Sequence, residues 1–260
     1  MSPKHPTILA LDFDGVICDG LIEYFQTTWR AYCQMWPNTD PTPPENLASS
    51  FYRLRPVIET GWEMPVVLRA LLRGIPEEKV RDEWPAVRRE IVAEARLDPA
   101  EVSDRVDGVR DEWINSNLNE WLSLHRFYPG AIARIQQALA SSVRVGVVTT
   151  KEERFVRSLL AQQGVELPEN AIYGKNVERP KYQILRELLG STTPTPEIWF
   201  VEDRLKTLES VEKQPDLQPV RLYLADWGYN TPDDRALAVE NSHIKLLSLE
   251  EFARDFSDWP

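Results

Sequence analysis

The sequence predicts an α/β protein whose doubly wound parallel sheet is interrupted by a helical insertion. From Pro129 onward, short apolar runs alternate with helical patterns, which is the arrangement of parallel strands joined by crossover helices. One more apolar run, residues 8–11, stands near the amino terminus, and the region between shows helical spacing without a convincing strand. We therefore expect a core formed by residues 1–18 and 127–260, with a helical domain, residues 19–126, inserted into it.

Five apolar runs have the composition of buried strands. They are residues 8–11, 143–148, 171–173, 198–201 and 220–224. The helix expected after 143–148 carries Phe155, Leu159 and Leu160 on one face. Pro180 and Gly190 mark the two ends of the next helix, because proline suits a first helical turn and glycine suits a helix end.

Four segments of the insertion favour helix. They are residues 21–36, 65–74, 76–97 and 98–125. The insertion also holds six of the nine tryptophans, which indicates that it has a core of its own. An insertion that follows the first strand is expected to lie over the carboxyl ends of the strands, where open α/β sheets bind ligands, and to act as a cap.

Composition excludes several classes of partner. A formal net charge of -11 opposes binding to nucleic acid or to an anionic membrane surface, so we expect a small-molecule partner. Only Cys18 and Cys33 are present, which favours a reducing compartment. The amino-terminal residues show neither a signal peptide nor a membrane span, so we expect a cytoplasmic protein.

Charged and hydroxyl side chains gather at the inferred strand ends. Asp12 and Asp14 follow the first strand and, two residues apart, point to the same side. The other groups are Thr149 and Thr150 after 143–148, Glu202 and Asp203 after 198–201, and Lys181 with Arg179 at the start of the helix that Pro180 begins. If these strands are neighbours, four carboxylates meet with hydroxyls and a cation in one small volume.

Four crowded carboxylates need a cation, and Mg²⁺ suits a site that also receives a phosphate. One aspartate could then attack phosphorus while its neighbour moves a proton, with hydroxyl and cationic groups on the phosphoryl oxygens. A single acidic pair is most often a helix start or a solvated turn. Four such signals in order, each at an inferred strand end, favour phosphoryl transfer.

These residues carry a resemblance to the haloacid dehalogenase (HAD) superfamily of phosphoryl-transfer enzymes, especially to the capped group that includes β-phosphoglucomutase and phosphoglycolate phosphatase. DFDGVICDG resembles the first motif, VVTTK the second, RPKYQIL the third and FVEDRLKTL the fourth, and FYPGA is similar to the return from cap to core. FVEDRLKTL and DWGYNT are also similar to a plant and cyanobacterial branch. The resemblance implies a Rossmann-like HAD core with an inserted α-helical cap.

The resemblance also implies a role for each motif residue. Asp12 would be the nucleophile that forms an aspartyl phosphate, and Asp14 the general acid and base. Thr149 would bind the phosphoryl group and Lys181 would neutralise it, with Arg179 as the alternative cation. Mg²⁺ would be held by Asp12, by the backbone carbonyl of Asp14, and by Asp203 with Glu202. The presence of Asp14 favours phosphate esters over haloacids.

Further substrate-binding candidates lie beside these motifs and in the insertion. Thr150 follows Thr149, and Arg53 and Arg55 could reach an anionic group of the substrate or form a surface pair beside a packed tryptophan. Asp19, at the entrance to the insertion, could bind substrate or cap a helix. The three histidines have no ligand spacing. Lys151 could interact with the nucleophile region, but a lysine at a helix start is ordinarily solvated.

The function these observations favour is an Mg²⁺-dependent phosphatase that hydrolyses a small phosphorylated metabolite. A sugar phosphomutase would use the same aspartyl phosphate, and a non-catalytic HAD-like scaffold or regulatory protein would keep the fold alone. The sequence predicts neither the substrate nor the oligomeric state.

Overall fold

The computed structural model describes residues 5–37 and 39–260, which form two compact units. The core unit comprises Met1–Asp19 and Arg126–Pro260, of which residues 1–4 lie outside the described part, and the helical unit is Gly20–His125. Within the described residues, no helix combines the length and the apolar character needed to cross a membrane.

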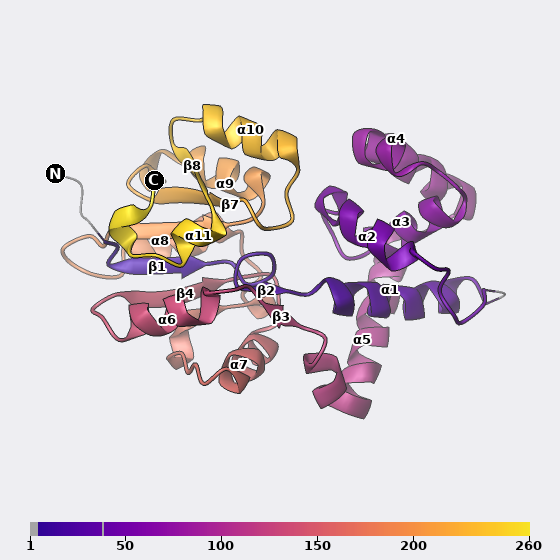
Figure 1. The fold of residues 1–260 in the computed structure, drawn as a ribbon, viewed down its shortest axis with the longest axis horizontal. Coiled ribbons are helices and arrows are strands. Elements are labelled where there is room, and N and C mark those ends of the chain that lie inside the picture. Colours follow the sequence, from indigo (N-terminus) through magenta and orange to yellow (C-terminus); the bar gives the residue numbers. More distant parts are fainter. Residues whose placement is uncertain (1–4, 38) are drawn as a thin grey trace. The chain divides into compact units, whose positions relative to one another are not determined.

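The core unit contains a six-stranded sheet in which every neighbouring pair is parallel (Figure 1). Its strands are β1 (Ile8–Leu11), β4 (Arg144–Val148), β5 (Ile172–Tyr173), β6 (Ile198–Glu202), β7 (Arg221–Ala225) and β8 (Ile244–Leu247). Their order is β5-β4-β1-β6-β7-β8, so β1 lies between β4 and β6. This confirms the predicted parallel α/β fold. The sheet also contains one strand that was not predicted, β8. Its four residues include the exposed Lys245, which weakens the apolar pattern.

The register brings the ends of the central strands level. Leu11, the last residue of β1, pairs with Val147 of β4 and with Val201 of β6. Asp12 therefore stands one residue beyond a shared rung, and Glu202 stands one residue beyond the same rung on the neighbouring strand. Parallel pairing thus places these two carboxylates side by side at the carboxyl edge of the sheet.

Helices cover both faces of the sheet (Figure 1). The helices α8 (Lys181–Leu189), α9 (Leu205–Glu212) and α10 (Pro232–Glu240) share one buried cluster with Ile8 and Ala10 of β1. The helices α6 (Ala131–Leu139) and α7 (Glu153–Gln162) lie on the opposite side. The short elements are η2 (Glu169–Ala171), η3 (Lys175–Val177), η4 (Pro215–Leu217), α11 (Leu249–Phe252) and η5 (Phe256–Asp258).

A tight turn follows β1 and leads to the boundary of the core unit. Gly15 has a φ of 89°, a left-handed conformation that glycine adopts without strain, and its N–H donates to the carbonyl of Cys18 at 2.8 Å. Beyond the turn, β2 (Cys18–Asp19) pairs antiparallel with β3 (Arg126–Phe127). The turn therefore places Asp14 just past the end of β1.

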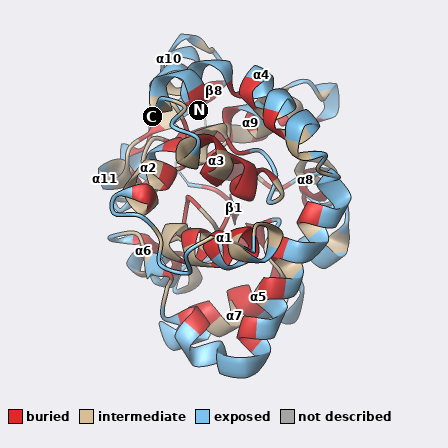
Figure 2. Cartoon of the chain, turned by 90° about the vertical axis from the view of Figure 1, so that its right-hand side faces the viewer, coloured by how far each residue is buried: buried red, intermediate tan, exposed pale blue. Residues whose placement is uncertain are grey.

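The helical unit consists of α1 (Leu21–Met35), α2 (Leu47–Leu54), η1 (Arg55–Val57), α3 (Glu63–Leu72), α4 (Glu77–Ala95) and α5 (Pro99–Leu122). Its own buried cluster confirms the predicted helical insertion, and seven of the ten residues of α3 are buried (Figure 2). Four helices agree with the predicted segments to within a few residues. The fifth, α2, was not predicted, although Leu47, Phe51 and Leu54 form an apolar stripe.

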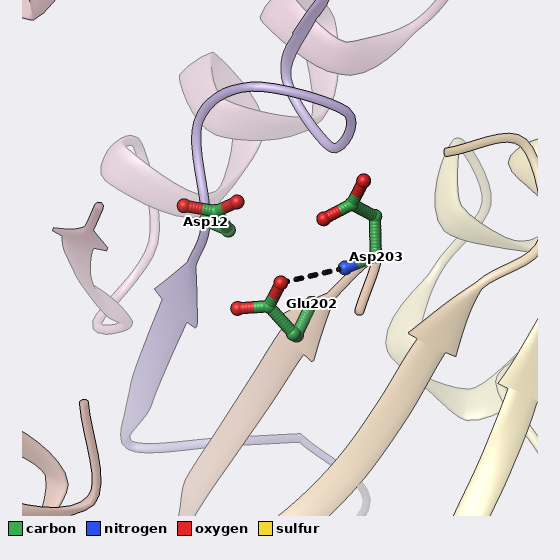
Figure 3. Close-up of side chains that lie close together, drawn as sticks. All are labelled: Asp12, Glu202 and Asp203. Atoms are coloured by element: carbon green, nitrogen blue, oxygen red, sulfur yellow. Dashed lines mark hydrogen bonds between the residues drawn. The ribbon is translucent and has the colours of Figure 1, made fainter. Parts of the chain in front are cut away.

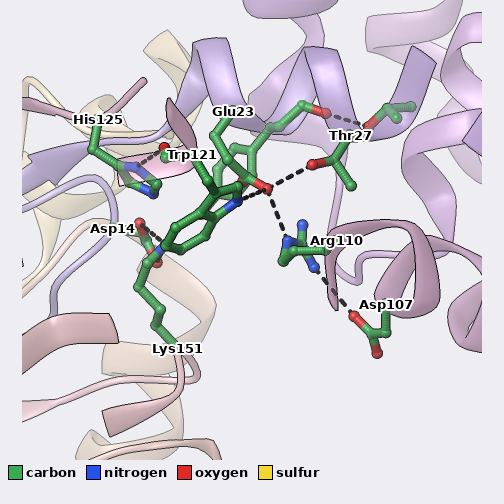
Figure 4. Close-up of polar contacts among 10 residues, drawn as sticks. Asp14, Glu23, Thr27, Asp107, Arg110, Trp121, His125 and Lys151 are labelled. Carbon is green, nitrogen blue, oxygen red and sulfur yellow. Dashed lines mark hydrogen bonds and ion pairs between the residues drawn. The ribbon is translucent and has the colours of Figure 1, made fainter. Parts of the chain in front are cut away.

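A buried ion pair joins the first and last helices of this unit (Figure 4). The fully buried Glu23 of α1 accepts hydrogen bonds at Oε1 from Arg110 Nε at 2.8 Å and from Trp121 Nε1 at 3.0 Å, both of α5. Thr27 Oγ1 donates to the same oxygen at 2.7 Å. Burial opposes the charge of Arg110, but the adjacent Glu23 carboxylate raises the pKa of its guanidinium. The pair ties α1 to α5.

Candidate functional site

Three buried carboxylates converge at the carboxyl edge of the sheet (Figure 3). They belong to Asp12 after β1, Glu202 at the end of β6 and Asp203 directly after it, and one oxygen from each lies within 4.8 Å of the others. The backbone N–H of Asp203 donates to Glu202 Oε1 at 3.2 Å, and that of Arg204 donates to the same oxygen at 3.1 Å. The strand ends therefore build an acidic cluster from residues far apart in the chain.

Lys181 is the cation of this cluster. Its Nζ lies 2.8 Å from Asp12 Oδ1 and 2.7 Å from Glu202 Oε2. The lysine opens α8, where Pro180 precedes the first turn. Burial opposes its charge, yet Asp12 and Glu202 together raise the pKa of Lys181. One ammonium group thus bridges two carboxylates and keeps them in a fixed arrangement.

The cluster carries more negative charge than one lysine offsets. Burial raises the pKa of Asp12 and of Glu202 to about 7, although Lys181 favours the charged form of both. Such a set of buried carboxylate oxygens is the donor set that a hard divalent cation prefers. Asp12, Glu202 and Asp203 are therefore suited to hold a metal ion, whose charge would favour their ionised forms.

The loop after β7 holds Asp203 in place. The N–H of Tyr229 donates to Asp203 Oδ2 at 2.8 Å, and Asn230 Nδ2 donates to the Asp203 carbonyl at 3.0 Å. Two glycines also pack against Asp203: a Cβ on Gly15 would lie 2.2 Å from Oδ2, and one on Gly228 would lie 2.3 Å from Cβ. Only residues without a side chain fit these two positions, so the turn after β1 and the loop after β7 close around Asp203.

Asp14 lies two residues after Asp12 in the chain, and Asp14 and Thr149 share a neighbour, Lys151. Lys151 Nζ lies 3.1 Å from Asp14 Oδ1. Thr149 is buried, its N–H donates to the Tyr173 carbonyl at 3.0 Å, and its Oγ1 accepts from the N–H of Lys151 at 3.1 Å. Thr150, by contrast, is exposed.

Two further substrate-binding candidates of the core unit, Arg179 and Asp19, contact residues outside the acidic cluster. Arg179 is exposed and pairs with Glu187 of α8, so Lys181 and not Arg179 is the cation beside Asp12. Asp19 accepts a hydrogen bond at Oδ1 from Tyr229 Oη at 2.9 Å. Asp19 is therefore joined to the same loop that holds Asp203.

The two arginine candidates belong to the helical unit. Arg53 is exposed and forms an ion pair with Glu77 at 2.7 Å. Arg55 donates from Nη1 to the Ile58 carbonyl at 3.0 Å, and its guanidinium lies over the ring of Tyr24, 5.2 Å from the centroid. Both arginines thus have contacts within the helical unit.

Four residues that contact the site were not among the candidates predicted from the sequence: Lys151, Gly228, Tyr229 and Asn230. Lys151 lies two residues after Thr149, close enough to suggest a role, but a lysine at a helix start is ordinarily solvated. The segment WGYN comes shortly after a strand, which is a signal for a loop, but its contacts to Asp203 depend on strand order and register. Those features appear only in the fold.

Comparison with known proteins identifies the fold. No protein-family model and no curated protein matches the chain. Among solved structures, a predicted phosphoglycolate phosphatase from Haemophilus somnus 129PT has a TM-score of 0.59 at 16% identity, covering 99% of this chain and 97% of that one. A predicted phosphatase from Clostridium acetobutylicum has a TM-score of 0.57 at 14% identity, covering 95% and 96%.

A haloacid dehalogenase-like hydrolase from Streptococcus pneumoniae is similar over 92% of this chain and 93% of its own, with a TM-score of 0.55 and 13% identity. Likeness at such low identity establishes the fold and leaves the activity open. The chain therefore has the fold of the haloacid dehalogenase-like hydrolases, a parallel α/β core with a helical cap domain inserted after its first strand.

Proposed function

We propose that this protein is an Mg²⁺-dependent phosphatase that hydrolyses the phosphate ester of a small metabolite through an aspartyl phosphate on Asp12. The observation that carries the proposal is the buried Asp12 carboxylate, held by Lys181 inside an acidic cluster with Glu202 and Asp203. The similar folds described as phosphatases support the same chemistry. A net charge of -11 favours a small substrate over a nucleic acid.

In the first step, a carboxylate oxygen of Asp12 attacks the phosphorus of the ester. The bond between phosphorus and the alcohol oxygen breaks as the new bond to Asp12 forms, and Asp14 donates a proton to the departing oxygen. Lys181, 2.8 Å from Asp12 Oδ1, orients the nucleophile and supplies positive charge near the phosphoryl group.

In the second step, a water molecule attacks the phosphorus of the aspartyl phosphate. Asp14, ionised after the first step, takes a proton from this water as the bond between phosphorus and Asp12 breaks. Inorganic phosphate leaves, and both aspartates return to their starting states. One residue thus acts as acid and then as base.

Thr149 is assigned to the phosphoryl oxygens. Its Oγ1 accepts a hydrogen bond from the N–H of Lys151, and that bond leaves the hydroxyl hydrogen to be donated elsewhere. A phosphoryl oxygen is the acceptor we assign to it. The backbone contact thereby fixes the direction in which Thr149 donates.

Asp12, Asp203 and Glu202, with the backbone carbonyl of Asp14, are assigned to hold Mg²⁺. When bound, the ion supplies positive charge that offsets the negative charge of the transferring phosphoryl group. Asp203 is oriented for this by the Tyr229 N–H, whereas both oxygens of Glu202 already accept hydrogen bonds from Lys181 or the backbone. We therefore assign Asp203 the stronger contribution to metal affinity.

The proposal is tested by incubating the purified protein with a panel of phosphorylated metabolites in MgCl₂, with and without a chelator. We expect phosphate release from at least one ester, loss of release with chelator, and loss of release in Asp12→Asn, whose amide fills nearly the same volume. Isomers of sugar phosphates are measured in the same reactions, because isomer formation without phosphate release would indicate a phosphomutase. Phosphate release that persists in Asp12→Asn, or no turnover of any ester, contradicts the proposal.

A further inference from the structure

The second aspartate of the site, Asp14, is held by a single side chain. Lys151 Nζ lies 3.1 Å from Asp14 Oδ1 and 3.4 Å from Oδ2, so the ammonium group contacts both oxygens (Figure 4). Among the described residues, no other side chain or backbone group forms a hydrogen bond with this carboxylate. The orientation of Asp14 therefore depends on Lys151.

The pair is largely shielded from water. The side chain of Lys151 is 8% exposed and that of Asp14 is 14% exposed. Lys151 Nζ also lies on the face of the Phe13 ring, 6.0 Å from its centroid. An ion pair on an exposed surface restricts its two side chains only weakly, because water competes for the charged groups. Around Lys151 and Asp14 this competition is reduced. The contact can thus hold Asp14 in one rotamer.

The backbone of Lys151 is itself fixed at three points. Its N–H donates to Thr149 Oγ1 at 3.1 Å, and its carbonyl accepts from the N–H of Lys175 at 3.0 Å. Gly174 packs against the same carbonyl so closely that a Cβ there would lie 2.8 Å from the oxygen. A functional side chain is most accurately placed when its supporting contacts are rigid, and Lys151 has such contacts.

The two lysines of the core site contact different carboxylates. Lys181 contacts Asp12 and Glu202, whereas Lys151 contacts Asp14. We propose that Lys151 is a positioning residue for proton transfer, holding the Asp14 carboxyl group where it meets the leaving oxygen as an acid and later the attacking water as a base. This inference rests on the proposed phosphatase function and adds to it a residue that neither sequence motifs nor fold comparison assigned.

The proposal makes a specific kinetic prediction. A misplaced acid slows proton transfer, so loss of Lys151 should lower kcat and leave KM nearly unchanged. The loss should depend on the leaving group, because an alkoxide needs its proton in the transition state far more than a para-nitrophenolate does. A lysine that only supported the fold would slow both substrates equally.

The test uses Lys151→Met, Lys151→Arg, Asp14→Asn and the double variant Lys151→Met with Asp14→Asn, each assayed on an alkyl phosphate and on para-nitrophenyl phosphate. We expect Lys151→Met to lower kcat on the alkyl phosphate by about 10- to 100-fold, and by less on para-nitrophenyl phosphate. Lys151→Arg, which keeps the charge, should recover part of the rate. In the Asp14→Asn background, Lys151→Met should cause less than about a twofold further loss, since both changes act on one group.

A remote variant tests the same point without altering either charged residue. In Gly174→Ala the new Cβ pushes against the Lys151 carbonyl oxygen at 2.8 Å and the Glu153 backbone nitrogen at 2.7 Å. The variant should lower kcat with the same dependence on the leaving group. Gly190→Ala is the matched control, because its Cβ would meet its nearest atoms at 3.6 and 3.8 Å, which are ordinary contacts. Thermal unfolding of each variant shows whether it is folded. Should Lys151→Met fail to fold, Lys151→Arg and Gly174→Ala carry the test.

The outcomes separate this inference from the proposed function. If the wild type releases phosphate but Lys151→Met and Asp14→Asn reduce kcat by independent, multiplying factors, Lys151 does not act through Asp14 and the inference is overturned. A rise in KM with kcat unchanged on both substrates would likewise overturn it, because it assigns Lys151 to substrate binding. If the wild type turns over no ester at all, the proposed function fails, and the inference fails with it.

Discussion

Adding one methyl group at Gly228 tests the packing around Asp203. In Gly228→Ala, the new Cβ would lie 2.3 Å from Asp203 Cβ and 2.6 Å from the carbonyl oxygen of Gly15. Carbon atoms in contact normally stand about 3.5 to 4.0 Å apart, so one of these neighbours must move by roughly 1 Å. Both belong to the backbone or lie next to it, and neither can swing away as the end of a flexible side chain can.

Two magnitudes follow from that displacement. Overpacking of a closed site destabilises a protein by about 1 to 3 kcal/mol, which lowers Tm by roughly 3 °C for each kcal/mol in a chain of this size. Moving Asp203 away from its contact with the Tyr229 N–H should also weaken Mg²⁺ binding by about 10- to 100-fold, the usual effect of disturbing a group that orients a metal ligand.

Urea unfolding and isothermal titration with MgCl₂ measure the two effects. The matched control is Gly190→Ala in the same unit, where the same methyl group meets only ordinary contacts. We expect this control to stay within about 0.5 kcal/mol of the wild type and to bind Mg²⁺ normally. A Gly228→Ala protein with wild-type stability and metal affinity would refute the close packing of this loop on Asp203.

Three further predictions concern buried charges. Burial raises the pKa of Asp12 and Glu202 to about 7 from ordinary values of 3.8 and 4.5, so the metal-free folded state retains protons that the unfolded chain releases. The stability of the metal-free protein should therefore fall as pH rises from about 4 to about 7. MgCl₂ should raise Tm more at about pH 8 than at about pH 5, because the carboxylates are then ionised. Equal increases in Tm at the two pH values would argue against a metal held by these groups. Lys181→Met should lower kcat by about 10²- to 10³-fold, since it removes the charge beside Asp12, the proposed nucleophile. A wild-type rate in steady-state kinetics would exclude that role. Glu23→Gln should destabilise the helical unit by about 3 kcal/mol, because it removes the buried carboxylate from Arg110 and leaves only the partly exposed Asp107 beside that charge. Unchanged urea unfolding would show that the pair is dispensable.

The sequence was most informative where local pattern and topology agree. The apolar run before Asp12 and the run before Glu202 predicted buried strands, and parallel pairing places their carboxyl ends at one edge. The carboxylates at this edge could therefore be identified from the sequence alone. The strand β8 was missed because only its first and last residues, Ile244 and Leu247, are buried, which is too weak a pattern to distinguish from a loop.

Contacts that depend on how two loops meet could not be predicted in the same way. Tyr229 reaches Asp203 because β7 lies next to β6 in the sheet. The spacing of residues in the sequence does not show which strands are adjacent. Lys151 was interpreted as solvated, as most lysines at helix starts are, yet its side chain is turned to Asp14 by backbone contacts to Thr149 and Lys175. Side-chain burial depends on the folded surroundings, which local sequence does not specify.

The proposed mechanism requires that Asp12 becomes phosphorylated during turnover. This is measured by mixing the protein with a ³²P-labelled ester from the substrate panel, quenching with acid within the first turnovers, and mapping the label by peptide mass spectrometry. We expect label on Asp12 in the peptide that spans residues 8–20, with none in Asp12→Asn. Phosphate release by the wild type without any labelled Asp12, or label on another residue, would contradict it.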